Sequence, residues 1–138
     1  MRKTLQAALV AMMLVSTGAL AQSITFEKCG SAKRITCVVD GDTIWFEGEK
    51  IRLMDYDTPE PTTNVCGGQI ERDLAAAASD RLLELLNKNQ FTIAREGEDQ
   101  YGRTLAVISV GGTNVGEILI AEGLARSWPN GIEFWCKQ

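Results

Sequence analysis

Four acidic residues lie in two short stretches of the chain where strands are expected to end. Asp40 and Asp42 flank a glycine in the first stretch, and Asp57 and Glu60 follow a β-rich run in the second. Aspartate and glycine are common in turns for conformational reasons, so either stretch alone predicts little about activity. Carboxylates that converge on one point, however, are the ligands that hard divalent cations prefer.

A hairpin between the two stretches would bring them together. If the chain turns back at Glu47-Gly48, Asp42 falls across from about Leu53, beside Arg52 and a few residues before Asp57. Like charges held together repel and raise each other's pKa unless a cation is present. We therefore expect a divalent metal site, and its all-oxygen ligands favour Ca²⁺ or Mg²⁺.

Two arginines extend this chemistry. Arg52 stands inside an expected strand, and Arg103 follows Tyr101-Gly102 at the start of another. The simpler alternatives are a surface strand and a solvated loop tip. Beside a metal, however, paired guanidinium donors can neutralise the charge that gathers on phosphoryl oxygens during phosphodiester hydrolysis. The sequence contains no histidine, which excludes a Ser-His-Asp triad, a histidine base and a histidine-ligated metal.

Five strands and two helices are expected to position these residues in one domain. The expected strands are Ile35–Val39, Thr43–Phe46, Ile51–Tyr56, Phe91–Arg95 and Leu105–Val110. Apolar residues recur every three or four positions from Ile70 to Leu86, which predicts a long helix between the third and fourth strands. Asn114, Glu117 and Gly123 mark a short helix after the fifth strand. The pattern predicts a mainly β, α+β fold: a five-stranded, partly open OB-type barrel.

Residues 1–21 predict a cleaved export signal. Arg2 and Lys3 precede the apolar run Leu5–Val15, and Ala19-Leu20-Ala21 has the small-x-small form of a cleavage site. A membrane anchor is the alternative, but the run is shorter than the ~20 residues that a bilayer span needs. We expect residues 22–138 to form an exported domain, periplasmic or secreted, with no membrane span in the mature form.

The charge balance does not by itself favour a polyanionic partner. The chain has 14 Lys+Arg against 18 Asp+Glu, a net charge of −4. Removal of the expected signal leaves 12 Lys+Arg against 18 Asp+Glu, a net charge of −6. A negative field of this kind weakens binding to nucleic acid unless positive charge is concentrated locally.

Four cysteines, Cys29, Cys37, Cys66 and Cys136, lie in the part of the chain that would be exported. An even count in an oxidising compartment favours two disulfides over four reduced thiols, and three pairings are possible. Spacings of 7, 28 and 69 intervening residues disfavour a thiolate zinc site. Cys29 and Cys37 flank a turn-like stretch, so we prefer that pair, which leaves Cys66 with Cys136.

Four stretches resemble the staphylococcal-nuclease-like, or thermonuclease, family. In family order they are Val38–Thr43, Arg52 with Asp57–Glu60, Asp99–Arg103 and Ala121–Ala125. One such motif would be weak, but four at compatible spacings are a specific signal. The resemblance implies a five-stranded OB-type barrel and Ca²⁺-dependent hydrolysis of DNA and RNA.

The resemblance also implies roles for individual residues. The family's metal carboxylates map onto Asp42 and Asp57, the Thr58 main-chain carbonyl is a further ligand, and Asp40 lies behind them. Its general base maps onto Glu60.

Its two phosphate-binding arginines map onto Arg52 and Arg103, and Tyr101 matches a nucleotide-contacting position. In the tail, Trp128, Phe134 and Trp135 could stack on bases, although packing in the core is the commoner role of such residues.

Two classes of function remain at this point. The first is an exported nuclease that binds one Ca²⁺ ion, acts as a monomer and has nucleic acid as its substrate. The second is a non-catalytic OB-fold binding module of the same family. A binding module has no need for Glu60, the arginine pair and the aspartate pair together, so the complete set favours the nuclease.

Overall fold

The computed structural model describes residues 23–137, and the expected export signal at 1–21 lies outside the described residues. The elements, in chain order, are β1 (Glu27–Lys28), β2 (Cys37–Asp40), β3 (Thr43–Phe46), β4 (Glu49–Leu53), β5 (Tyr56–Asp57), α1 (Gly68–Lys88), β6 (Phe91–Glu98), β7 (Thr104–Val110), β8 (Thr113–Asn114), α2 (Val115–Ala121), β9 (Arg126–Ser127) and the 3₁₀ turn η1 (Phe134–Cys136).

The main sheet runs in the order β1-β2-β3-β4-β7-β6, and β8 pairs with β7. Strands β2, β3 and β4 form an antiparallel meander, β4 pairs in parallel with β7, and β6 is antiparallel to β7. These five longer strands and the two helices confirm the predicted α+β, OB-like fold. Phe26, Phe46 and Phe91 pack with ring centroids 5.8–6.0 Å apart, so an aromatic cluster joins β3 to the two ends of the sheet.

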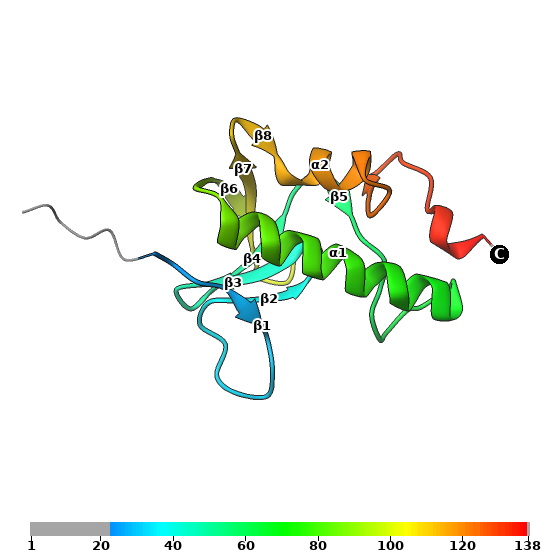
Figure 1. Ribbon diagram of the computed structural model, residues 1–138, viewed down its shortest axis with the longest axis horizontal. Helices are drawn as coiled ribbons and strands as arrows, with labels where there is room; N and C mark the ends of the chain where they lie inside the picture. The colour runs from blue at the N-terminus through cyan, green and yellow to red at the C-terminus, as the bar shows by residue number, and fades with distance from the viewer. Residues whose placement is uncertain (1–22, 138) are drawn as a thin grey trace, which may run out of the picture.

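Helix α1 lies across the sheet, with α2 beside it (Figure 1). Its buried residues are Glu71, Ala75, Ala78, Ser79, Leu82, Leu85 and Leu86. Against them pack Val38, Ile44 and Ile51 of the meander, each with no exposed surface. The sequence prediction of this helix is therefore confirmed, with its apolar stripe as the core face.

The third expected strand, Ile51–Tyr56, is wrong as a continuous strand. Asp55 adopts a positive φ of 71°, which few residues other than glycine tolerate, and this breaks the run. The second piece, β5, leaves the main sheet and pairs antiparallel with β9. Asp57 consequently lies opposite Arg126, a neighbour that the predicted strands do not give it.

The first and fourth strands also differ from their predicted bounds. β2 begins at Cys37 rather than Ile35, because Ile35 is 54% exposed and belongs to the loop closed by the first disulfide. β6 continues beyond Arg95 to Glu98.

Gly41 is required where the β2–β3 turn meets the helix. A Cβ atom at this position would lie 2.6 Å from the Thr58 Cγ2 atom and 2.9 Å from the Ala78 Cβ atom. The glycine therefore allows the turn that carries Asp40 and Asp42 to pack against α1 and the segment after β5.

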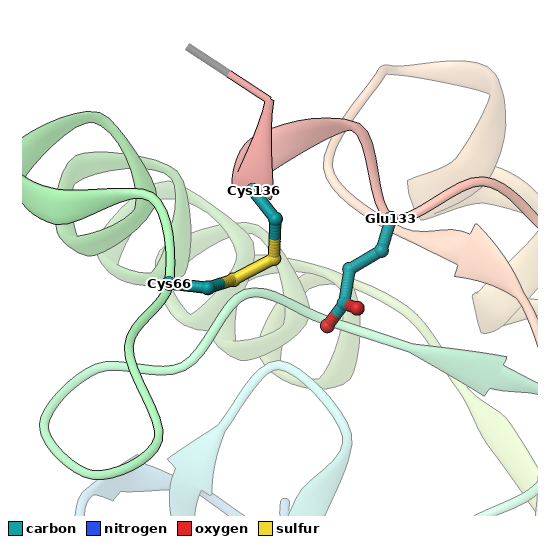
Figure 2. Close-up of side chains that lie close together, drawn as sticks. All are labelled: Cys66, Glu133 and Cys136. Atoms are coloured by element: carbon teal, nitrogen blue, oxygen red, sulfur yellow. A yellow bond between two sulfur atoms is a disulfide. The ribbon is translucent and has the colours of Figure 1, made fainter.

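Two disulfides confirm the preferred pairing. Cys29 and Cys37 are joined across a Cα–Cα distance of 5.0 Å, and Cys66 and Cys136 across 4.9 Å. The second bridge, drawn in Figure 2, ties the C-terminal tail to the segment just before α1, and Figure 1 shows the tail beside that end of the helix. In the described part of the chain, no helix has the length and apolar character needed to cross a membrane.

Candidate active site

Asp42 is the centre of the site and is almost buried, at 7% exposure. Its Oδ2 atom accepts hydrogen bonds from the Thr58 main-chain nitrogen and hydroxyl, both at 3.1 Å. Its Oδ1 atom accepts one from the Thr43 hydroxyl, also at 3.1 Å. The Leu53 nitrogen donates to the Asp42 carbonyl at 2.8 Å, which confirms the predicted register between Asp42 and Leu53. The hairpin and the β5 segment together thus hold this carboxylate.

Arg52 connects the two acidic stretches. Its Nη2 atom lies 3.3 Å from Asp42 Oδ2 and 3.8 Å from Asp57 Oδ1. The same guanidinium donates to the main-chain carbonyls of Leu53 and Tyr56, at 2.5 Å and 3.2 Å. Its side chain is only 18% exposed, and these carbonyl and carboxylate acceptors hold the guanidinium in one orientation.

Asp57 has a second arginine partner that the sequence reasoning missed. Arg126 Nε donates to Asp57 Oδ2 at 2.8 Å, and both side chains are largely buried. Arg126 also donates to the Gly131 carbonyl at 3.0 Å and lies over the rings of Trp128 and Trp135, with its Cζ atom 5.1 Å and 5.8 Å from the centroids. In the sequence, the available clue to this role was that Arg126 directly follows the Ala121–Ala125 motif.

Asp40 and Asp42 face each other within the β2–β3 turn. The Asp42 nitrogen donates to Asp40 Oδ1 at 3.1 Å, and burial together with the charge of Asp40 raises the pKa of the Asp42 carboxyl to about 7. Arg52 opposes this shift without cancelling it. A buried, acidic, all-oxygen arrangement of this kind suits a hard divalent cation, whose charge would reverse the shift. The donor set therefore fits a hard divalent cation, the class to which the expected Ca²⁺ or Mg²⁺ belongs.

The carboxylate oxygens of this site do not lie close enough together to form a metal site that is already assembled. Among residues 23–137, the acidic and cysteine side chains with three ligand atoms within 4.8 Å of one another are Cys66, Glu133 and Cys136. Figure 2 shows that the two cysteines of that group are joined to each other, so their sulfur atoms are not free thiolates. Between Asp42 and Asp57 stands the Arg52 guanidinium instead of a direct carboxylate contact.

Glu60 lies on the loop after β5, close to the same charges. Burial raises its pKa, and the negative charges of Asp42, Asp57 and Glu71 raise it further, against the opposite effect of Arg52. A carboxylate with a raised pKa is a better proton acceptor near neutral pH. The structure thus places Glu60 near enough to Asp42 and Asp57 for their charges to act on it, as the clustering of acidic residues in the sequence led us to expect.

Glu71 of α1 holds the main chain of this loop, and the sequence reasoning missed it as well. Its side chain is fully buried and accepts hydrogen bonds from the nitrogens of Glu60 at 3.1 Å and of Cys66 and Gly67 at 2.6 Å. Burial raises its pKa, but these three donors outweigh burial, so its pKa is lowered. The clue in the sequence was that the charged Glu71 lies at helical spacing from Ala75, Ala78 and Leu82, on the buried face of α1.

A groove of about 360 Å³ lies beside this cluster. Arg52, Arg103, Tyr101 and Trp128 line it, together with Asp99 and other residues of the same loops. Tyr101 and Trp128 are exposed, at 74% and 53%, whereas Trp135 is buried at 2% and belongs to the core. The structure therefore brings Arg52, Arg103 and Tyr101 to one surface, and of the tail tryptophans only Trp128 reaches it.

Arg103 is fixed separately from the aspartate cluster. Its Nε atom donates to Asp99 Oδ2 at 2.6 Å, and its Cζ atom lies 5.5 Å from the centroid of the Tyr101 ring. Asp99 also accepts from the nitrogens of Tyr101 and Arg103, which orders the loop before β7. Arg103 thus faces the groove without touching the carboxylates that Arg52 contacts.

Several known proteins of similar sequence are named as nucleases. The thermonuclease of Staphylococcus intermedius is 35% identical over 107 residues, covering 71% of this chain and 60% of that protein. Endonuclease YncB of Bacillus subtilis (strain 168) is 38% identical over 96 residues, covering 64% of this chain and 44% of the relative. A micrococcal nuclease of Shigella flexneri is 32% identical over 104 residues, 66% of this chain and 55% of that protein.

The chain therefore spans less than two thirds of the length of these relatives. A family model described as "Staphylococcal nuclease homologue" matches residues 50–132, which include Arg52, Asp57, Glu60, Arg103 and Arg126. The chain belongs to the staphylococcal nuclease homologue family.

Proposed function

We propose that this chain is an exported, calcium-dependent nuclease that hydrolyses phosphodiester bonds of DNA, RNA or both. The observation that carries the proposal is Arg52, which contacts Asp42 and Asp57 on one side and lines the groove with Arg103 on the other. This arrangement puts a carboxylate cluster and two guanidinium groups beside one substrate-sized surface.

One Ca²⁺ ion would be held by Asp42, Asp57 and the Thr58 main-chain carbonyl, with Asp40 supporting Asp42 from behind. When bound, it would supply positive charge that favours the negatively charged transition state of phosphodiester hydrolysis. The buried, mutually repelling carboxylates support this assignment because a cation would relieve their repulsion.

Glu60 is the proposed general base. It takes a proton from the attacking water as the water oxygen bonds to phosphorus. The bond from phosphorus to the leaving sugar oxygen breaks, and that oxygen keeps the electron pair and takes up a proton from solvent to leave as a hydroxyl group. The raised pKa of Glu60 favours this role, since a stronger base accepts the proton more readily. Arg52 and Arg103 donate to phosphoryl oxygens, whose negative charge grows in the transition state.

Tyr101 is proposed to contact the nucleotide, because its exposed ring stands at the groove beside Arg103. We further propose that residues 22–138 act as a single monomeric domain after removal of residues 1–21. The two disulfides support export, because such bonds persist in oxidising compartments.

The test is cleavage of single-stranded DNA by the Glu60→Gln variant, with added CaCl₂ and with a chelator. The variant should lose roughly 10²–10⁴ in kcat, about 3–5 kcal/mol of barrier, because the amide cannot accept the proton. Glu117→Gln, an exposed position on α2, is the matched control and should cleave like the wild type.

Cleavage by Glu60→Gln within about threefold of the wild type would remove Glu60 from the mechanism. Asp42→Ala should abolish saturable Ca²⁺ binding in calorimetry, and unchanged affinity would move the metal site elsewhere. Wild-type protein that binds DNA without hydrolysing it in Ca²⁺ would favour the binding-module alternative.

A further inference from the structure

Most basic side chains of the described chain are already paired with a carboxylate. Within residues 23–137, ion pairs shorter than 4.0 Å occupy Lys28, Arg52, Arg81, Lys88, Arg95, Arg103 and Arg126. The basic residues in that part of the chain without such a pair are Lys33, Arg34, Lys50, Arg72 and Lys137. The first three of these gather at one place, although they are separated in sequence.

Lys33 and Arg34 belong to the loop that the Cys29–Cys37 disulfide closes. This loop runs beside the β3–β4 turn, because the Gly48 nitrogen donates to the Ile35 carbonyl at 2.9 Å. A second bond joins the Glu47 nitrogen to the Thr36 hydroxyl at 3.2 Å. Figure 1 shows the loop projecting away from α2 and the C-terminal tail.

A hollow of about 650 Å³ separates this loop from the hairpin, and Lys33, Arg34, Trp45 and Gly48 are among the residues that line it. Trp45 lies directly opposite Lys50 in the β3–β4 register. Facing residues in an antiparallel pair project to the same side of the sheet, so Lys50 shares the face that carries Trp45. Lys33 and Arg34 thus line a hollow together with Trp45, and Lys50 projects from the same face of the sheet directly beside Trp45.

The same face continues to the candidate active site. Thr43 and Arg52 form the next pair on this side, since side chains alternate between the faces, whereas Ile44 and Ile51 point into the core. Two residues along a strand correspond to about 7 Å, so Lys50 stands one side-chain position from Arg52. The nearby acid Glu49 is neutralised by Arg95 at 2.7 Å, and Glu47 is the one exposed acid of the turn itself.

We propose that Lys33, Arg34, Trp45 and Lys50, hereafter the hairpin surface, bind the phosphate backbone of a polynucleotide outside the cleavage site. The inference rests on the proposed function for the identity of the strand. Cations grouped around an aromatic ring are the usual means of holding a single strand, and the faces of the second and third OB strands commonly bind oligonucleotides. The excess of acidic residues makes a local basic track necessary for a long polyanion.

A narrow track that continues into Arg52 fits a chain-like polyanion better than a flat anionic membrane. A strand with one phosphate at Arg52 would continue along β4 to Lys50 and then to the disulfide-closed loop. The hairpin surface would therefore matter for long substrates and not for the shortest ones.

The test compares two charge-matched triple variants. The first removes the proposed contacts by Lys33→Gln, Arg34→Gln and Lys50→Gln. The control removes three cations elsewhere by Arg72→Gln, Lys88→Gln and Lys137→Gln. Binding of a fluorescent oligodeoxythymidylate of about 20 nucleotides, longer than the usual single-fold site, is measured by anisotropy in chelator over a range of salt concentrations.

The triple variant of the hairpin surface, hereafter the hairpin variant, should bind the long oligonucleotide at least about tenfold more weakly than the wild type at low salt. The slope of log binding constant against log salt concentration should be smaller in magnitude by about 2, as for three lost phosphate contacts. Cleavage of a trinucleotide should stay within about twofold of wild type, while the KM for the long substrate rises. The control variant should lose less than about threefold in affinity.

An equal loss in both variants would mean that net charge alone acts, and unchanged binding by the hairpin variant would likewise overturn the proposal. Loss of binding to phosphatidylglycerol vesicles without loss of oligonucleotide binding would reassign the surface to lipid. If the wild type cleaves nothing, the proposed function fails, and the binding measurement still decides this inference separately.

Discussion

Replacement of Glu71 by glutamine removes a buried charge that organises the loop carrying Glu60. Three main-chain nitrogens converge on this carboxylate, those of Glu60, Cys66 and Gly67. Glutamine has the same shape but only one acceptor oxygen. When that oxygen faces Cys66 and Gly67, the amide NH₂ group faces the Glu60 N–H, and two donors oppose each other.

The size of the effect follows from these contacts. A hydrogen bond to a charged group contributes about 1.5–3 kcal/mol, and a neutral one about half as much. Two bonds weakened and one lost correspond to about 4 kcal/mol of unfolding free energy. For a domain of this size, the melting temperature should fall on the order of 15 °C.

The loss should also depend on pH with a definite sign. The pKa of Glu71 in the folded protein is below the ordinary 4.5, so its ionised form stabilises the fold. That stability is fully present above about pH 5 and is lost as the pH falls below 4.5 through the folded pKa. The difference in stability between wild type and Glu71→Gln should therefore be largest near pH 7 and shrink in acid.

Urea unfolding at pH 7 and near pH 3 measures both effects. Glu84→Gln is the matched control, because Glu84 is also on α1 but forms exposed pairs with Arg81 and Lys88, which contribute about 1 kcal/mol or less. The reasoning would be refuted if Glu71→Gln lowers the free energy of unfolding by less than about 1 kcal/mol at pH 7, or if the loss is the same at both pH values.

Three further predictions concern the site and its supports. Arg126→Gln should lower the free energy of unfolding by about 2 kcal/mol in urea titrations, because it strips Asp57 Oδ2 of its 2.8 Å donor; a change under about 0.5 kcal/mol would contradict this. Arg52→Lys should lower kcat, because a single ammonium cannot replace the planar fork, and a rise in KM alone would make Arg52 a binding residue. The Cys66→Ser/Cys136→Ser variant should lose about 4.4 kcal/mol by loop-closure entropy, against about 2.6 kcal/mol for loss of the short-loop disulfide. Calorimetric melting of both variants checks this order, and the reverse order would show that chain entropy does not dominate.

The parts of the site that the sequence predicted are those fixed by local pairing. The turn at Glu47-Gly48 sets the β3–β4 register, and this register alone brings Asp42 beside Leu53 and Arg52. Hydrophobic periodicity likewise identified α1, since its buried residues recur at helical spacing. A two-residue turn and a helix period are properties of neighbouring residues, so they can be read without knowing the rest of the chain.

Arg126 and Glu71 escaped prediction because their roles depend on contacts that no local rule specifies. The Asp57–Arg126 pair joins residues 69 apart, and it exists only because Asp55 takes a positive φ and sends β5 to β9 rather than along the sheet. The two residues also act on opposite sides of the same centre. Arg126 fixes the Asp57 carboxylate from the tail, whereas Glu71 fixes the Glu60 main chain from the helix. Since the Cys66–Cys136 bridge joins the tail to the start of that helix, the site depends on the C-terminal segment although no proposed metal ligand lies in it.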